Sequence, residues 1–167
     1  MDLVYYAACP SPLGELLLAG NEMGLGGVWF RDGRYLPGRL GEETGLDHPV
    51  LAETAAWLDA YFAGKNPDPS DVKLAPQGSP FRQLVWEELK KIPYGQTTTY
   101  GSIAKTLEAT LGRRVAAQAV GGAVGHNPIS ILIPCHRVVG SGGGLTGYGG
   151  GLWRKEYLLA LERGGRR

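Results

Sequence analysis

The chain has 167 residues, enough for one ordinary domain or two small ones with a hydrophobic core. Hydrophobic residues make up 43% of it and charged residues 20%, as in most globular proteins. No apolar run approaches the roughly 18 residues that span a bilayer, and the first residues lack the basic start and apolar stretch of a secretory signal. These features argue against a membrane partner and predict a cytoplasmic protein.

Charge is distributed unevenly along the chain. Residues 1–75 contain five Lys or Arg and eleven Asp or Glu, a net charge of −6, whereas residues 76–167 contain twelve and five, a net charge of +7. An acidic and a basic half predict two domains with these boundaries, of which only the second suits a polyanion such as DNA. Positive charges scattered over solvated faces would give the same count, so charge alone leaves nucleic-acid binding open.

The two cysteines, Cys9 and Cys135, are far apart, and neither belongs to a Cys-x-x-Cys pair. Two cysteines do not make a disulfide framework, and both are expected to be free thiols in a reducing compartment. A structural zinc needs about four ligands, and the chain offers only two Cys and three His. We therefore expect no metal and no other cofactor. Cys9 lies on a predicted strand and is expected in the core.

The N-terminal half has the pattern of an α/β domain, a small antiparallel sheet with one helix. Turn residues separate three short runs of strand-forming residues, at 4–8, 15–19 and 25–30. Residues 31–48, rich in Gly, Arg and acidic residues, are typical of a surface loop. The spacing of apolar residues predicts a helix over residues 49–63. Prolines and glycines between 66 and 78 then predict a linker into the basic half.

The C-terminal half is predicted to be mainly helical. Ser79 as N-cap and Pro80 at the first helical position begin one helix, and apolar spacing predicts three more. Their expected ranges are about residues 99–110, 114–124 and 152–163. The two middle helices and the tight turn between them resemble a helix-turn-helix of the winged-helix kind, which by itself is a weak indication of DNA binding.

A turn, a strand and a loop are expected between the last two helices. Asn127 and Pro128 predict a sharp turn, and residues 130–133 predict a short buried strand that Pro134 ends. Residues 140–151 contain eight glycines and are expected to form a mobile loop.

The third predicted helix of this half contains adjacent glycines, Gly121 and Gly122, each of which costs a helix about 1 kcal/mol relative to alanine. Close packing against another helix would explain them. Close approach of the helix backbone to a ligand such as a DNA groove would also explain them, because small residues leave room. The sequence does not decide between the two.

Cys135 is the sharpest chemical feature, since it follows Pro134 and precedes His136 and Arg137. A thiol becomes a good nucleophile only as the thiolate, and a nearby cation or a hydrogen-bonded His favours that state. His136 need not touch Cys135, because a bridging water would connect them. The other interpretation is a small buried hydrophobe that adjoins a His by chance.

A series of motifs surrounds Cys135. The central one is Ile131-Leu132-Ile133-Pro134-Cys135-His136-Arg137-Val138-Val139. The flanking ones are Ile92-Pro93-Tyr94-Gly95, Thr99-Tyr100-Gly101, Ala119-Val120-Gly121-Gly122-Ala123, Asn127-Pro128 and Thr146-Gly147-Tyr148-Gly149-Gly150-Gly151. Together they resemble the signature of the O6-alkylguanine-DNA alkyltransferases. The resemblance is close over residues 79–163 and looser over the N-terminal third, and the Pro-Cys-His-Arg run is highly specific.

The resemblance implies a DNA repair protein that moves an alkyl group from O6-alkylguanine, and also from O4-alkylthymine, irreversibly onto its own cysteine. Cys135 would be the acceptor. His136 would remove the thiol proton through a water, and Glu162 would orient His136 and balance its charge. Tyr100 would donate a proton as the base leaves. This chemistry is reasonable, because an O6-alkyl carbon is a poor electrophile that requires a thiolate and a stabilised leaving group.

The resemblance also implies residues that bind the base and the DNA. The damaged base must be flipped out of the duplex, where the backbone at Val138 and Gly149 would contact guanine, Tyr148 would wall the alkyl pocket, and Asn127 would hold the adjoining turn. The recognition helix would dock in the minor groove of double-stranded DNA. Contacts with the DNA backbone are expected from Thr99, Arg113, Arg114, Ala119, Gly122 and Arg137. For Arg113 and Arg114 a solvated helix end is the alternative.

One position departs from the family pattern. The residue two before Val-Gly-Gly is usually an arginine that inserts into the base stack, but here it is Gln118. Glutamine fills space and can hydrogen-bond to the orphaned cytosine, but it offers neither a stacking guanidinium nor a charge. We expect Gln118 to affect base extrusion and DNA affinity rather than transfer at Cys135.

The sequence leaves two rival functions open. A damage-sensing, alkyltransferase-like protein would lack the acceptor cysteine, which this chain has. A DNA-binding regulator with a redox-sensing thiol would need a resolving partner, and Cys9 is a poor one. Salt-dependent DNA binding is expected of all three functions and does not separate them. We expect a monomer, located in the cytoplasm and associated with the nucleoid through DNA.

Overall fold

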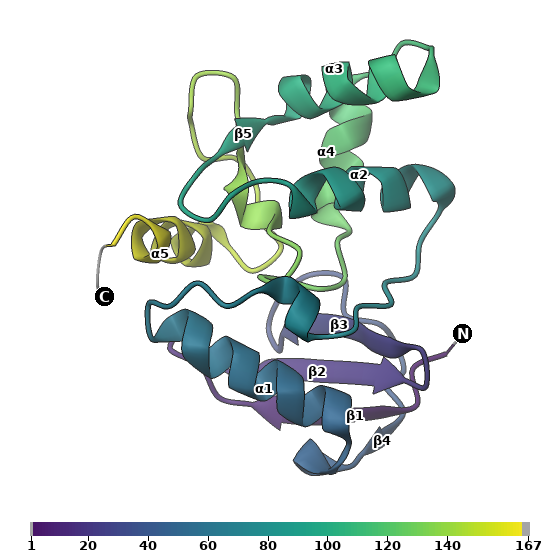
Figure 1. Cartoon of the computed structure of the whole chain (residues 1–167), viewed down its shortest axis with the longest axis vertical. Helices are drawn as coiled ribbons and strands as arrows, with labels where there is room; N and C mark the ends of the chain where they lie inside the picture. Colours follow the sequence, from purple (N-terminus) through teal and green to yellow (C-terminus); the bar gives the residue numbers. More distant parts are fainter. Residues whose placement is uncertain (1, 165–167) are drawn as a thin grey trace. The chain divides into compact units, whose positions relative to one another are not determined.

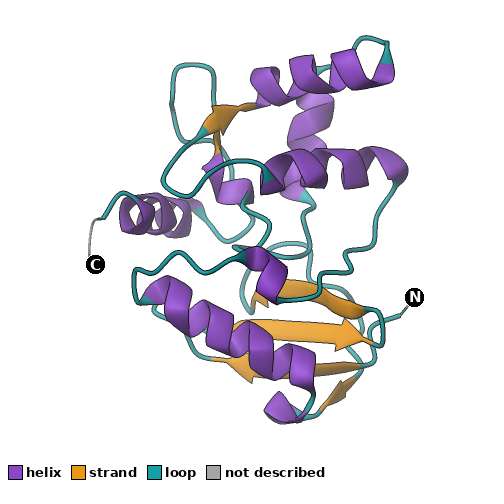
Figure 2. Cartoon of the chain, viewed as in Figure 1, coloured by secondary structure: helices purple, strands orange, loops and turns teal. Residues whose placement is uncertain are grey.

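The computed structural model describes residues 2–164. The chain divides into two compact units: one contains Met1–Gln77 and Pro128–Ser130, and the other contains Gly78–Asn127 and Ile131–Arg167. Figures 1 and 2 show a sheet and a helix in the first unit and a mainly helical second unit. This is the fold class predicted from the sequence. Within residues 2–164, no helix is both long enough and apolar enough to cross a membrane.

The sheet of the first unit has the strand order β3-β2-β1-β4 in the described part of the chain. Its strands are β1 (Tyr5–Cys9), β2 (Leu16–Asn21), β3 (Gly24–Phe30) and β4 (Glu42–Glu43). The first three pair antiparallel, within two residues of their predicted bounds. β4 pairs parallel with β1, with Tyr5 opposite Glu42. The sheet is therefore mixed rather than antiparallel, because part of the predicted loop at 31–48 adds a strand.

Helix α1 (Pro49–Phe62) packs on this sheet (Figure 1). Pro49 suits the first helical position because that position has no intrahelical partner for an N–H. The buried residues of α1 recur at helical spacing and form one side of the helix. They are Leu51, Thr54, Ala55, Trp57, Leu58 and Tyr61. Cys9 is also buried in this unit, which confirms its predicted place in the core.

The segment Pro128–Ser130 completes the first unit. The N–H of Val28 on the edge strand β3 donates to the carbonyl of Pro128, and the N–H of Ser130 donates to the carbonyl of Val28. Ile129 thereby forms an isolated bridge with Val28. The residue pattern did not predict this pairing, since about a hundred residues separate the two partners in sequence.

The second unit contains α2 (Pro80–Lys90), α3 (Tyr100–Leu111), α4 (Ala117–Gly125) and α5 (Leu152–Glu162). Side-chain caps begin two of these helices, with Ser79 accepting the N–H of Arg82 and Thr99 accepting that of Ser102. Gly112, with φ of 68°, ends α3 in the left-handed conformation that favours glycine.

Helices α3 and α4 pack against each other and against α2, which gives the predicted helix-turn-helix (Figure 1). The Glu108 carboxylate accepts the N–H of Val115 at 2.9 Å and closes the turn between α3 and α4. The Trp86 indole donates to the carbonyl of Ala123 at 2.8 Å and anchors α4 to α2. A short parallel pair, β5 (Thr98–Thr99) and β6 (Val138–Val139), holds the start of α3 beside the segment that follows Cys135.

Two sequence expectations for this half are wrong in detail. The helix expected from residue 114 begins at Ala117, because Ala116 before it is extended and the N–H of Val115 donates to the Glu108 carboxylate. Residues 130–133 do not form a strand, because Ile131 has φ of 73° and interrupts the extended backbone. The segment is buried as predicted, but it turns, and it brings Cys135 to the site from a loop.

Candidate active site

Cys135 begins a short 3-10 turn, Cys135–Arg137, directly after Pro134. The Cys135 N–H donates to the carbonyl of Ile133 at 2.8 Å, and the Arg137 N–H donates to that of Pro134 at 3.0 Å. Backbone hydrogen bonds on both sides of the residue therefore set its position. Cys135 is only 7% exposed, so its thiol lies in the interior of the second unit.

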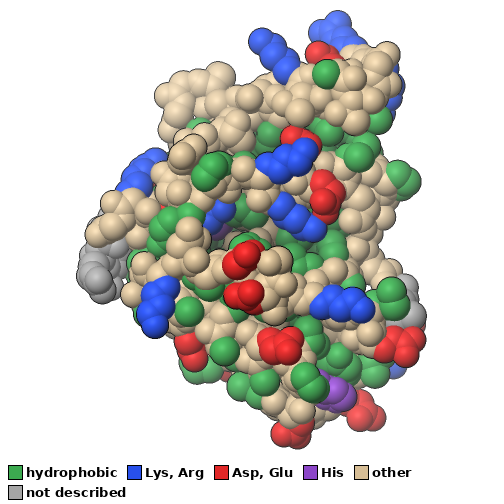
Figure 3. All heavy atoms as spheres, in the orientation of Figure 1, with side chains coloured by type: hydrophobic (Ala, Val, Ile, Leu, Met, Phe, Trp, Pro, Cys, Tyr) green, Lys and Arg blue, Asp and Glu red, His purple; other side chains and the backbone are tan. Residues whose placement is uncertain are grey.

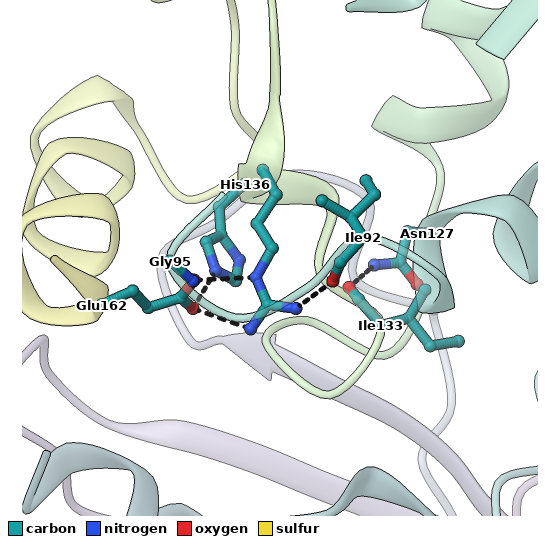
Figure 4. Close-up of polar contacts among 7 residues, drawn as sticks. Ile92, Gly95, Asn127, Ile133, His136 and Glu162 are labelled. Atoms are coloured by element: carbon teal, nitrogen blue, oxygen red, sulfur yellow. Dashed lines mark hydrogen bonds and ion pairs between the residues drawn. The ribbon is translucent and has the colours of Figure 1, made fainter. Parts of the chain in front are cut away.

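The surroundings of the thiol act on its pKa in opposite directions. Burial raises the pKa of Cys135, while a hydrogen bond from the Asn127 side chain, the charge of Lys155 and the backbone N–H groups of Cys135 and His136 lower it. Burial has the larger effect, so the resting thiol is neutral. The Asn127 amide also donates to the carbonyl of Ile133 at 2.8 Å and braces the loop before the thiol (Figure 4). The site is thus arranged to stabilise a thiolate once its proton has been removed.

His136 contacts Glu162, as the resemblance implies (Figure 4). Nε2 of His136 lies 2.7 Å from Oε2 of Glu162, and both side chains are fully buried. Burial lowers the pKa of His136 in spite of the neighbouring carboxylate, so the ring is neutral at pH 7. A neutral ring that donates from Nε2 carries an acceptor lone pair on Nδ1. Nδ1 has no hydrogen-bond partner among residues 2–164, which leaves it available to accept a proton.

Hydrogen-bond donors surround the Glu162 carboxylate. Oε1 accepts from Nε of Arg137 at 2.7 Å and from the N–H of Gly95 at 3.1 Å, and Oε2 accepts from Nη2 of Arg137 at 3.0 Å. Burial alone would raise the pKa of Glu162, but hydrogen bonds from His136 and Arg137 and their charges hold it well below its usual range. Glu162 is therefore ionised and fixes the orientation of the imidazole.

The expectation that Arg137 contacts the DNA backbone is wrong. Arg137 is buried, and its guanidinium makes the two hydrogen bonds to Glu162. Its remaining terminal nitrogen, Nη1, donates to the carbonyl of Ile92 at 2.8 Å. An exposed phosphate contact would require this network to break, so Arg137 neutralises Glu162 instead.

Lys155 is a component of the site that the residue pattern did not reveal. The side chain is fully buried, and Nζ donates to the carbonyls of Val138 at 2.7 Å and Thr146 at 3.4 Å. Burial lowers the pKa of Lys155, while negative charge on Cys135 favours its protonated form. Helical spacing could have identified it, because residues three, four and seven positions apart share a face. The other buried residues on this face of α5 are Leu158, Leu159 and Glu162.

Tyr100 and the glycine-rich loop meet beside this cluster. The hydroxyl of Tyr100, the first residue of α3, shares a hydrogen bond of 2.8 Å with the hydroxyl of Thr146. The Tyr100 ring lies against Gly121, where an added Cβ would be 3.8 Å from the ring. Tyr148 and Gly149 are half-buried in the same loop. Its Tyr148 carbonyl accepts the N–H of Gly151 at 2.8 Å, which forms the turn before α5.

The residues expected to face DNA are mainly on the surface. Arg113, Arg114, Gln118, Ala119 and Gly122 are exposed, and Thr99 is half-buried because its hydroxyl caps α3. A Cβ on Gly122 would meet nothing within 4 Å, so packing within the chain does not explain this glycine. On the face drawn in Figure 3, Lys and Arg side chains gather over the second unit and acidic side chains over the first. This distribution agrees with the charge asymmetry of the sequence.

The fold and the site together define a class of protein, in which a helix-turn-helix unit carries a buried cysteine beside a His–Glu pair. Comparison with known families then places the chain. The family model for the 6-O-methylguanine DNA methyltransferase DNA binding domain matches residues 80–164, and the model for the ribonuclease-like domain of the same proteins matches residues 4–76. The chain belongs to the 6-O-methylguanine DNA methyltransferase family.

Its relatives cover nearly the whole chain. A Methanosarcina acetivorans protein named methylated-DNA–protein-cysteine methyltransferase is 48% identical over 162 residues, which are 95% of this chain and 98% of the relative. The protein of that name from Mycolicibacterium paratuberculosis is 46% identical over 162 residues, 96% of this chain and 93% of the relative. The crystal structure of Mycobacterium tuberculosis OGT in complex with DNA has a TM-score of 0.84 and 40% identity, and the match covers 98% of this chain and 96% of that one.

Proposed function

We propose that this protein repairs DNA by transferring an alkyl group from O6 of guanine to its own Cys135, once per molecule. The observation that carries the proposal is the buried cluster of Cys135, His136 and Glu162, in which Nε2 of a neutral His136 is held by Glu162 while Nδ1 is available. The names of the family and of its relatives support it. The thioether product is not hydrolysed under mild conditions, so each molecule would be consumed.

Proton removal would activate the thiol. A water between Cys135 and Nδ1 of His136 would pass the proton to the ring, and the imidazolium that forms would be balanced by Glu162. Asn127 and Lys155 would stabilise the thiolate. The sulfur would then bond to the alkyl carbon while the carbon–O6 bond breaks and its electron pair passes to guanine.

The guanine would lie between Tyr100, the loop and the backbone beside the thiol. Tyr100 would donate a proton to the departing base, which lowers the barrier for expelling guanine. The Val138 carbonyl accepts one hydrogen bond from Lys155 and keeps a second lone pair for the base edge. The backbone N–H of Gly149 would contact O6, and the Tyr148 ring would line the pocket for the alkyl group.

Double-stranded DNA would bind along α4 through its minor groove. The exposed side of α4 carries only small or uncharged side chains, and the open space around Gly122 allows close approach of a groove. Arg113 and Arg114 are exposed just before α4, where they suit phosphate contacts, and Thr99 lies at the start of α3. This arrangement supports ligand approach rather than helix packing as the reason for the glycine at 122.

Base flipping would rely on Gln118, which is exposed in the first turn of α4. Its amide would fill the space left by the flipped nucleotide and hydrogen-bond to the orphaned cytosine. Because it lacks a guanidinium, we expect weaker DNA binding and slower extrusion than an arginine would give.

We further propose that the protein acts as a monomer on nucleoid DNA in the cytoplasm and also accepts O4-alkylthymine. The groups assigned to the reaction all come from one compact unit of one chain, so a second copy is not required to complete the site.

Intact mass spectrometry tests the proposal directly. After incubation with a duplex that carries one O6-methylguanine, the wild-type protein should gain about 14 Da, the mass added when S–H becomes S–CH₃. Peptide mapping should place this mass on Cys135. C135A should gain nothing. C9A is the matched control, because it removes the other buried thiol and should react like the wild type.

Tight binding to the lesion without any gain in mass would contradict the repair function. That outcome would favour a protein that senses alkylated bases, and Q118R would then show whether base extrusion is what limits transfer. A disulfide-linked or oxidised Cys135 that changes DNA affinity would favour a redox regulator instead.

A further inference from the structure

Thr146 occupies an unusual position in the loop between β6 and α5. This loop, residues 140–151, contains eight glycines, so few of its residues have side chains that can fix its position. Thr146 is half-buried, and its hydroxyl lies 2.8 Å from that of Tyr100, 46 residues away in sequence. Tyr100 is the proposed proton donor, so the group that sets the position of its hydroxyl affects proton transfer.

Three contacts on different parts of Thr146 hold it in place. Its carbonyl accepts from Nζ of Lys155 at 3.4 Å, and its hydroxyl bonds to Tyr100. Its methyl group lies against Gly140, where an added Cβ would be only 3.2 Å from Cγ2 of Thr146. Gly140 is itself held, because its N–H donates to the carbonyl of Gly144 at 2.9 Å. The Thr146 hydroxyl is therefore presented to Tyr100 from a braced backbone rather than from a free loop.

We propose that Thr146 is a positioning residue for the departure of guanine, whose hydroxyl orients the Tyr100 hydroxyl and stabilises the oxygen that Tyr100 exposes when it gives up its proton. This inference rests on the proposed function. When Thr146 donates the shared hydrogen bond, the proton of Tyr100 is left to point toward the base. As that proton leaves, the same bond becomes charge-assisted and strengthens, so it stabilises the transition state more than the resting state.

The bonds, electron pairs and protons of the proposed step balance. The bond between the Cys135 sulfur and the alkyl carbon forms, the carbon–O6 bond breaks, and its electron pair passes to guanine. The Tyr100 proton moves to a guanine nitrogen, which leaves a phenolate oxygen that accepts from Thr146. Thr146 keeps its own proton, and the thiol proton resides on His136 until solvent restores Tyr100.

Single-turnover methyl transfer at saturating DNA is the test, with T146V removing the hydroxyl at constant shape. We expect T146V to lower the rate constant about tenfold, the effect of losing one charge-assisted hydrogen bond in the transition state. The DNA concentration for half-saturation should not change. T146S should restore most of the rate. T110V, which alters an exposed threonine on α3, is the matched control and should react like the wild type.

Two further measurements separate proton donation from a general disturbance of the pocket. Alkylation of Cys135 by iodoacetamide expels iodide, which needs no proton, so T146V should not slow it. In a Y100F background, T146V should cause no further loss of methyl transfer, because the two residues act through one hydrogen bond.

The inference is overturned if T146V transfers methyl at the wild-type rate, if iodoacetamide alkylation slows equally, or if the losses in Y100F and T146V multiply. Each of these results presupposes that the wild-type protein transfers methyl. No transfer by the wild type would overturn the proposed function itself, so the two failures are distinguishable.

Discussion

The two cysteines lie in regions that are equally buried but differ in polarity. Cys9, at the end of β1, is 6% exposed, and Cys135 is 7% exposed. Burial raises the pKa of both thiols. Around Cys9, the negative charge of Asp59 raises the pKa further, and the thiol donates to the carbonyl of Pro10 at 3.6 Å. Around Cys135, Asn127 and the ammonium of Lys155 act in the opposite direction.

The comparison shows that burial does not distinguish a structural cysteine from a reactive one. A free cysteine in a core behaves as a small hydrophobe unless its neighbours favour the thiolate. Near Cys135, Glu162 holds the neutral ring of His136. Lys155 lies in the same site, and among residues 2–164 its hydrogen bonds go to backbone carbonyls and not to a carboxylate. Variants that remove these groups one at a time should therefore make Cys135 behave like Cys9.

The largest effect is expected from E162Q. An amide has no charge to orient His136 or to balance Arg137, so methyl transfer should fall by about 10²–10⁴-fold, the usual contribution of a general base. The unpaired buried charge of Arg137 should also lower the free energy of unfolding by about 3–5 kcal/mol. Single-turnover kinetics and urea unfolding measure the two effects.

E156Q is the control for this variant, since Glu156 lies exposed on the same helix. It should leave both quantities unchanged. Methyl transfer by E162Q within threefold of the wild type would contradict the assigned role of Glu162.

An intermediate effect is expected from K155M. Removing a cation near the thiol should raise the pKa of Cys135 further and slow its alkylation by iodoacetamide about tenfold near pH 7. Alkylation of Cys9 should not change, and peptide mapping distinguishes the two sites. K65M, which removes an exposed lysine, is the matched control. An equal change at Cys9 and Cys135 would indicate loss of structure rather than loss of a local charge.

The smallest effect is expected from pH. Burial lowers the pKa of His136, so in the folded protein this ring should stay neutral even somewhat below pH 6.5. The ordinary pKa of a histidine side chain is about 6.5. The methyl-transfer rate should stay level from pH 8 to about 6.5 and decline only in more acidic solution. The unfolded chain binds a proton at His136 below about 6.5 while the folded chain does not, so stability should fall with acid in the same range.

Rates between pH 5 and 8 and urea unfolding at the same pH values provide the measurement. H48Q, which removes a histidine of the first unit, should leave the rate profile unchanged. A midpoint above 6.5 that persists in H48Q would contradict a neutral, buried His136.

Local patterns predicted much of this molecule because they depend on neighbours in sequence. The Ser79–Pro80 start of α2, the meander of three strands and the buried stripe of α1 all follow from capping, turn residues and periodicity. The motif around Cys135 indicated the family and the partnership of His136 with Glu162.

Contacts that only the folded chain makes decide which charged side chains are buried and what they bind. Arg137 and Lys155 are of residue types that usually lie on the surface, and the family resemblance implied a DNA contact for Arg137. The fold brings Glu162 and the Ile92 carbonyl to Arg137, and the Val138 and Thr146 carbonyls to Lys155. A charge can be buried only where such partners converge, and their convergence is a property of the packed chain.

The sequence by itself thus determined the fold class and the family, and it predicted Cys135 as the nucleophile. The tertiary structure alone decided which charges surround Cys135, that residues 130–133 turn instead of forming a strand, and that Thr146 meets Tyr100. The physical reason is that helix caps and periodicity act over a few residues. The electrostatics of a buried thiol are set by groups that are distant in sequence and become neighbours only on folding.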